Sequence, residues 1–173
     1  DEVRKQRKHS TIVTATPAYS SQSKGSVERM IWEVEGQVRA IIFELERCFK
    51  IEIKVNDVIV IWVVRHAGWI ITRFRVKSDG ATAYVRLRGR EFGGEIAMVG
   101  EKVSYKVNPV GAKMDHRFAR GLWLGKTENT DEHLVGNKDG VWTVRTIRRL
   151  PKSEKWDTDM LKELAGTPWA MRA

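Results

Sequence analysis

The sequence predicts an α+β protein in which a helical first part is followed by a small antiparallel barrel. Apolar residues recur every three or four positions from 26 to 49, and a second long apolar segment runs from 57 to 76. Both patterns favour helices. From Lys102 onwards, short β-like runs are separated by Gly, Asn or Asp turns. Four or five short strands within about sixty residues are typical of a small β-barrel.

The first helix has the clearest pattern in the chain. Ser26 is a candidate N-cap, and Glu28 lies in the first turn, where the helix dipole favours a negative charge. The apolar stripe of this helix comprises Val27, Met30, Ile31, Val34, Val38, Ile41, Ile42, Leu45 and Phe49.

The segment 57–76 gives conflicting signals. Its Val and Ile content favours a strand, but about twenty residues without a turn marked by Gly or Pro favour a buried helix, and we interpret the segment as a helix. After a turn at residues 78–80, Thr82 is placed to cap a short helix that runs to Leu87 and ends at Gly89.

Short runs of β-forming residues follow residues 93 and 94. Asn137-Lys138-Asp139-Gly140 is a strong hairpin signal before the last run. The tail is polar, with a weak helix near 157–164, and we expect it to dock loosely. The predicted strands are 102–107, 118–124, 132–135 and 141–147, and a further short strand is predicted at 10–16.

Composition narrows the class of protein. Lys and Arg number 31 against 22 Asp and Glu, so the net charge is +9 and a polyanionic partner is favoured. The single Cys48 excludes an internal disulfide framework, and the longest apolar run, Val58 to Val64, is too short to cross a bilayer. We therefore expect an intracellular protein with no membrane partner. Because the chain opens with Asp1 in a charged stretch, we expect it to be a piece of something longer.

Basic residues gather in two stretches, and we expect at least one of them to contact phosphates. The first contains Arg86, Arg88, Arg90, Lys102, Lys106, Lys113, Arg117 and Arg120, and the second contains Arg145, Arg148, Arg149 and Lys152. The aromatic residues Trp62, Trp69, Phe74 and Tyr84 have apolar neighbours, which favours core positions over base stacking.

One segment, Tyr19 to Arg29, combines a polar loop with a carboxylate at a helix start. Such a carboxylate can ligate a hard cation such as Mg²⁺, which takes oxygen ligands. A Glu in a first helical turn is more often only a solvated partner of the helix dipole. On the residues alone, both interpretations stay open.

The same segment resembles the end of the catalytic core of retroviral and retrotransposon integrases, in which a Tyr-containing loop, a Gln-Ser pair and a Gly precede the last acidic residue. The resemblance implies an RNase H-like fold whose Asp, Asp, Glu triad holds two Mg²⁺ or Mn²⁺ ions and joins donor DNA ends to target DNA. Glu28 matches the third triad residue and metal ligand. The DNA-binding loop is matched by Tyr19, Gln22, Ser23 and Lys24.

Further segments extend this resemblance to most of residues 10–150, and these segments resemble those of copia-like retroelement polyproteins. Residues 34–39, 66–74 and 79–84 resemble the helices and turn that close such cores, and 122–125 and 141–145 resemble an SH3-like barrel downstream. The implied organisation is a truncated catalytic core (1–92), a small SH3-like barrel (93–152) and a polar tail (153–173).

The resemblance also carries consequences for activity. Both triad Asp residues should precede this chain, so we expect it to be inactive alone and the helical stripe to be exposed. The implied partner is DNA in the nucleus, and a homo-oligomer is left open. The residues predicted to bind DNA in the helical part and the barrel are Arg86, Arg88, Arg117, Arg145 and Arg148. The alternatives are a non-enzymatic DNA- or chromatin-binding relic and a basic scaffold with no DNA role.

Overall fold

The computed structural model describes residues 25–106 and 117–171. The chain divides into two units, residues 1–33 and 34–173, and each is described by itself. In the first unit, the described residues form the start of helix α2 (Gly25–Phe49). Val27, Met30 and Ile31 are exposed there, as expected for this half of the stripe. The strand predicted at 10–16 lies outside the described residues.

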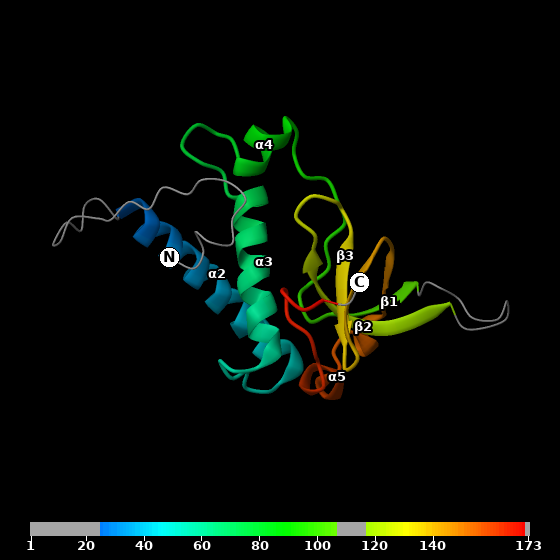
Figure 1. Cartoon of the computed structure of the whole chain (residues 1–173). Helices are drawn as coiled ribbons and strands as arrows, with labels where there is room; N and C mark the ends of the chain where they lie inside the picture. The colour runs from blue at the N-terminus through cyan, green and yellow to red at the C-terminus, as the bar shows by residue number, and fades with distance from the viewer. Residues whose placement is uncertain (1–24, 107–116, 172–173) are drawn as a thin grey trace, which may run out of the picture. The chain divides into compact units, whose positions relative to one another are not determined.

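The helices of the second unit follow the predictions closely (Figure 1). The segment interpreted as a helix is α3 (Val58–Phe74), which confirms that length outweighed the β-propensity of its Val and Ile residues. The short helix α4 (Ala83–Arg88) begins where the Thr82 side chain accepts a hydrogen bond from the Val85 amide. It ends at Gly89, whose φ of 70° is the left-handed conformation that favours glycine.

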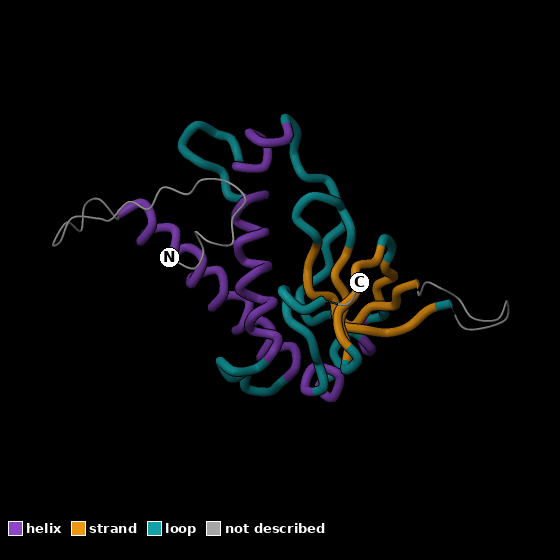
Figure 2. The backbone as a smooth tube through the Cα atoms, in the orientation of Figure 1, coloured by secondary structure: helices purple, strands orange, loops and turns teal. Residues whose placement is uncertain are grey.

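Five antiparallel strands form one sheet in the order β4-β3-β2-β1-β5 (Figure 2). Asn137 to Gly140 makes the predicted hairpin between β3 and β4. The prediction of a single strand at 141–147 is wrong. Residues 140–144 pair with β3 and form β4, whereas residues 147–149 pair with β1 and form β5. The strands are β1 (Lys102–Lys106), β2 (Phe118–Lys126), β3 (His133–Asn137), β4 (Gly140–Val144) and β5 (Ile147–Arg149).

The sheet is curled rather than flat. Strand β2 pairs with β1 through its first half and with β3 through its second half, and its register shifts between Trp123 and Gly125. Such a bulge bends the strand. Strands β1 and β4 are three steps apart, about 14 Å in a flat sheet. Nevertheless, the ring centroids of Tyr105 on β1 and Trp142 on β4 are 6.3 Å apart, so the two ends of the sheet approach each other.

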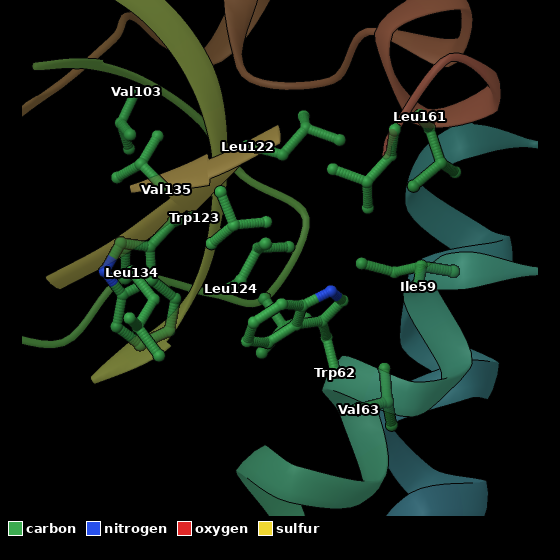
Figure 3. Close-up of a cluster of buried hydrophobic side chains, with 14 of the residues drawn as sticks. Ile59, Trp62, Val63, Val103, Leu122, Trp123, Leu124, Leu134, Val135 and Leu161 are labelled. Atoms are coloured by element: carbon green, nitrogen blue, oxygen red, sulfur yellow. The ribbon is translucent and has the colours of Figure 1, made fainter. Parts of the chain in front are cut away.

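The helices and the sheet share one hydrophobic core within the second unit. Trp62 on α3 is completely buried, and Figure 3 shows it directed toward Leu124 of the sheet. Of the α2 stripe, Leu45 and Phe49 are buried in this core. The end of the predicted stripe is therefore covered, unlike its beginning. Within the described residues, no helix is long and apolar enough to span a membrane.

The C-terminal tail is packed against this core, contrary to the expectation of a loosely docked segment. A turn of 3-10 helix, η2 (Lys152–Glu154), leads to α5 (Thr158–Lys162), which is capped by Asp157. Leu161 and Leu164 are buried, and the Trp62 indole donates a hydrogen bond to the Gly166 carbonyl at 3.1 Å. The prediction was wrong because it relied on the polar composition of the tail. Two leucines at helical spacing are buried and hold the tail against the core.

Candidate nucleic-acid interface

A row of polar side chains crosses three strands of the sheet. Ser104 on β1 pairs with Arg120 on β2 and with Arg148 on β5. Residues that are directly opposite in neighbouring strands project from the same face. The residues beside Ser104 on β1, Val103 and Tyr105, are buried in the core. The alternation of a strand therefore directs Ser104 and both arginines outward.

An aromatic ring lies on the same face as this row. Phe118 precedes Arg120 by two residues on β2 and remains 45% exposed. The Arg148 guanidinium lies 4.8 Å from the centroid of its ring. Lys106 pairs directly across from Phe118. Arg117 is exposed and precedes Phe118 in the chain, but strand alternation does not place it on this face. We call Lys106, Phe118, Arg120 and Arg148 the basic face.

The described ion pairs leave the basic face strongly positive. Arg120 pairs with Glu154 at 3.1 Å, and both side chains are about half exposed. An exposed pair of this kind contributes about 1 kcal/mol or less, so a phosphate can replace the carboxylate at little cost. Exposed cations around an exposed ring provide phosphate contacts and a surface on which a base or sugar can pack.

The strand pairing places some cations of each predicted basic stretch on the basic face and others elsewhere. It brings Arg120 of the first stretch beside Arg148 of the second. Two other predicted cations form internal ion pairs instead. The Lys102 ammonium lies 3.0 Å from the Asp157 carboxylate, and the Arg149 guanidinium lies 2.7 Å from the buried Glu101 carboxylate. Only some of the predicted cations are therefore available on this face. Phe118 was missed, although its i, i+2 spacing to Arg120 in a strand was a readable signal.

The other predicted DNA-binding residues lie apart from this row. Arg145 follows β4, is 90% exposed and lies 3.6 Å from the Glu132 carboxylate. Arg86 and Arg88 end α4, where Arg86 pairs with Asp79. Arg88 lines a cavity of about 410 Å³ together with Arg73 and Glu128.

The integrase-like segment is only partly described. Tyr19, Gln22, Ser23 and Lys24 lie outside the described residues. Glu28 is exposed in the first turn of α2. Nowhere among the described residues do three or more His, Cys, Asp or Glu side chains gather to hold a metal ion. Within the described residues, Glu28 alone is therefore too little to hold a two-metal centre, which needs further carboxylates.

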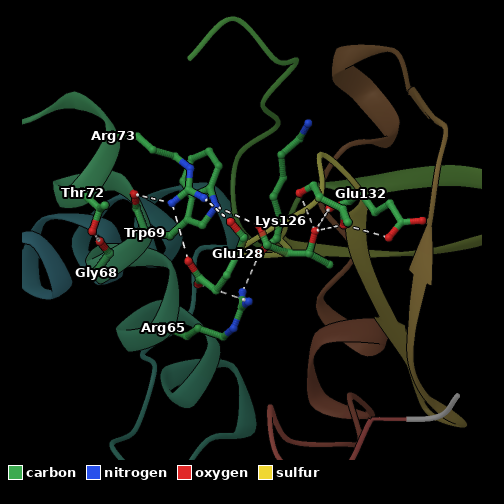
Figure 4. Close-up of polar contacts among 10 residues, drawn as sticks. Arg65, Gly68, Trp69, Thr72, Arg73, Lys126, Glu128 and Glu132 are labelled. Atoms are coloured by element: carbon green, nitrogen blue, oxygen red, sulfur yellow. Dashed lines mark hydrogen bonds and ion pairs between the residues drawn. The ribbon is translucent and has the colours of Figure 1, made fainter. Parts of the chain in front are cut away.

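A partly buried polar network joins α3 to the loop after β2 and has a structural role (Figure 4). The Arg65 guanidinium donates to the Lys126 carbonyl at 2.8 Å, and the Arg73 guanidinium donates to the Glu128 carbonyl at 3.0 Å. Arg73 also lies 4.1 Å over the ring of Trp69, which is itself buried. These cations are used internally, which removes them from the candidate phosphate contacts.

Next to this network, His66 makes stability depend on pH. Its side chain is buried, and its Nδ1 has no hydrogen-bond partner in the described structure. Burial and the charges of Arg65 and Arg73 lower the pKa of His66 to about 4. An unfolded histidine, with a pKa of about 6.5, binds a proton between these values while the folded one does not, so stability falls as pH falls.

We expect His66 to reduce the free energy of unfolding by about 2 kcal/mol between pH 7 and pH 5. Urea unfolding of the native chain and of His66→Phe at both pH values measures this. The variant should lose less stability. Burial also lowers the pKa of His133, which both proteins keep, so some loss should remain. Equal losses in the two proteins would show that His66 is not the group responsible.

Comparison with known proteins assigns no family to this chain. No family model, no curated protein and no solved structure matches it.

Proposed function

We propose that this chain is the C-terminal part of a retroelement integrase and that its sheet binds duplex DNA through phosphate contacts. The observation that carries the DNA-binding part is the row Arg148–Ser104–Arg120 beside the exposed ring of Phe118. The row is built by strand pairing on a sheet whose other face is core. Its cations are therefore held at fixed spacing, which suits a repeating polyanion.

The architecture supports an SH3-like barrel as the carrier of this face. Five short antiparallel strands follow one another, β2 is shared between the two halves of the sheet, and β5 returns to pair with β1. In the proposal, α2 and α3 are the closing helices of an RNase H-like core whose sheet lies upstream. The exposed apolar residues at the start of α2 would pack against that core.

The catalytic part of the proposal rests on the motif. Glu28 would be the third acidic ligand of the Mg²⁺ or Mn²⁺ site, and Tyr19, Gln22, Ser23 and Lys24 would meet donor and target DNA. When bound, the metal ions would supply electrophilic assistance to phosphoryl transfer. The motif supplies one of the three carboxylates, so the complete protein would be the polynucleotidyl transferase, acting in the nucleus, and this part alone would be inactive.

A second candidate function is a non-enzymatic relic that retains only DNA or chromatin binding. The observation that favours it is that the described residues contain the row Arg148–Ser104–Arg120 but no group of three or more acidic, His or Cys side chains that could hold a metal ion. The reading frame upstream of Asp1 distinguishes the two candidates. An Asp placed after a strand-like run supports the integrase, and a stop codon there or the absence of such an Asp supports the relic.

We expect the double variant Arg120→Ala/Arg148→Ala to bind a 20-base-pair duplex about tenfold more weakly than the native chain near 100 mM salt. Each arginine is expected to neutralise one phosphate. The slope of log affinity against log salt concentration should therefore become shallower by about two. Fluorescence anisotropy of a labelled duplex at several salt concentrations measures both quantities.

The matched control is Arg39→Ala/Arg47→Ala, which removes the same charge from α2. Both of these arginines are exposed and pair only with neighbours on the same helix, Glu35 and Glu44. We expect this control to change affinity about twofold or less, because its charges lie off the basic face. Equal losses in both double variants would mean that overall charge, and not this face, binds DNA.

A further inference from the structure

The basic face carries an aromatic ring that phosphate contacts alone do not use. The ring belongs to Phe118, whose side chain is 45% exposed. Phe118 is the first residue of β2, and it pairs with Lys106, the last residue of β1. The ring therefore lies where these two strands end, beside the row that contains Arg120 and Arg148 rather than within it.

The side chain of Arg148 extends over this ring. In the sheet, Arg148 pairs with Ser104 and Phe118 pairs with Lys106, so Arg148 and Phe118 lie on opposite sides of β1 and are offset by two positions. The Arg148 guanidinium nevertheless lies 4.8 Å from the centroid of the ring. A planar guanidinium stacks well on an aromatic face. Together, the two side chains present a planar surface with a positive charge beside it.

The charges around the ring do not balance. Arg148 forms no ion pair with any described residue, and its contact there is with the ring of Phe118. Arg120 pairs with Glu154, but both side chains are about half exposed. Such a pair is weak and is screened by salt, so Glu154 does not exclude a phosphate. The ring and the two arginines therefore favour a ligand that is both planar and anionic.

A nucleotide has both properties, but only an unpaired nucleotide can use the ring fully. Inside a duplex, the faces of the bases are stacked on one another, and the grooves display only base edges. An unpaired base exposes its face, and stacking on an aromatic side chain is favourable for every base. The ring of Phe118 therefore adds a contact for single-stranded DNA that the interior of a duplex cannot make.

We propose that the basic face is a binding site for single-stranded DNA and that one unpaired base stacks on the ring of Phe118. Arg120 and Arg148 contact the phosphates on either side of β1, and the Arg148 guanidinium holds the ring in place from one side. The inference rests on the proposed DNA binding and deepens it, because it names the form of DNA that this face selects.

The experiment compares two single strands that differ only in their bases. One is an oligonucleotide of about 12 thymidines, a length within the range that a small single-strand-binding fold covers. The other has the same number of phosphates, but every nucleotide lacks its base. Fluorescence anisotropy of end-labelled strands measures both affinities at one salt concentration. We expect the native chain to bind the thymidine strand about tenfold tighter, because only this strand can stack on Phe118.

Variants locate the stacking contact. Phe118→Ala should lose about tenfold in affinity for the thymidine strand and about threefold or less for the blunt duplex, in which the ring meets only sugars. Phe118→Trp should restore the affinity, whereas Phe118→Leu keeps apolar bulk without an aromatic face and should not. The reference variant is Phe43→Ala, which removes a ring that is 70% exposed on α2, off the basic face. Circular dichroism spectra verify that each variant folds.

Two results would overturn this inference and leave the proposed function standing. The first is duplex binding by the native chain together with equal affinities for the thymidine strand and the strand without bases. The second is an equal loss in Phe118→Ala for the thymidine strand and the duplex, which would make the ring a general contact and not a stacking site. If the native chain binds neither strand nor the duplex, the proposed DNA binding fails and this inference fails with it.

Discussion

Replacement of Trp62 by alanine is expected to lower the free energy of unfolding by about 3–5 kcal/mol. The Trp62 side chain is completely buried between α3 and the sheet, so truncation leaves a large cavity in the shared core. It also removes the hydrogen bond from the indole to the Gly166 carbonyl at 3.1 Å. A loss of this size would remove much of the stability of a typical domain.

Urea unfolding monitored by circular dichroism measures this effect. Trp62→Phe keeps an aromatic ring and loses the hydrogen bond, so a smaller loss of about 1–2 kcal/mol is expected. Trp169→Ala is the control, because its exposed indole should contribute little. A change below about 1 kcal/mol in Trp62→Ala would contradict a core shared by the helices and the sheet.

Glu101→Ala is expected to cost about 3 kcal/mol, the next largest effect. The Glu101 side chain is 1% exposed. It accepts two hydrogen bonds from the Arg149 guanidinium, both at 2.7 Å, and lies 3.3 Å from the Lys155 ammonium. The Met98 amide also donates to it. Removal leaves two cations without their partner and deletes the side-chain link between Arg149 of β5 and the residue that precedes β1.

The dependence of this effect on pH identifies its origin. Burial opposes ionisation of Glu101, but hydrogen bonds from Arg149 and the Met98 amide outweigh it, so its pKa is lowered. A lowered carboxyl pKa contributes stability that is present above the unfolded value, about 4.3, and is lost as pH falls through the folded pKa. We therefore expect the native chain and Glu101→Ala to converge in stability at acid pH.

Glu52→Ala is the matched control, because Glu52 is exposed and its removal should change the free energy of unfolding by about 0.5 kcal/mol or less. Glu101→Gln keeps the shape of the side chain and should fall between the native chain and Glu101→Ala. Near-equal stability of Glu101→Ala and Glu52→Ala at pH 7 would exclude the ion-paired role of Glu101.

Elements with strong local signals were predictable from the sequence. The helix at Val58–Phe74 was predictable from the length of its apolar segment, which outweighed the β-propensity of its Val and Ile residues. The short helix after Thr82 needed a capping hydroxyl, and its end needed a glycine that adopts a positive φ. The Asn137–Gly140 hairpin was determined in the same way. These features depend on interactions between residues a few positions apart, which a sequence displays directly.

The arrangement of the candidate functional side chains was decided only by tertiary structure. Nothing local places Arg120 beside Arg148, since their neighbourhood depends on both strands pairing with β1. Tyr105 and Trp142 meet for a similar reason, because the sheet curls and its ends approach. Buried ion-pair partners could not be predicted from the sequence either. Arg149 pairs with the buried Glu101, so it does not contribute to the basic face.

The sequence by itself therefore determined the α+β class, the helices, the hairpin and an excess of positive charge. Tertiary structure alone decided which cations remain exposed, which rings approach each other and how the tail is held by Leu161, Leu164 and Gly166. The physical reason is that helix and turn formation depend on short-range sterics and hydrogen bonds. Strand register and burial are instead set by contacts between residues far apart in the chain.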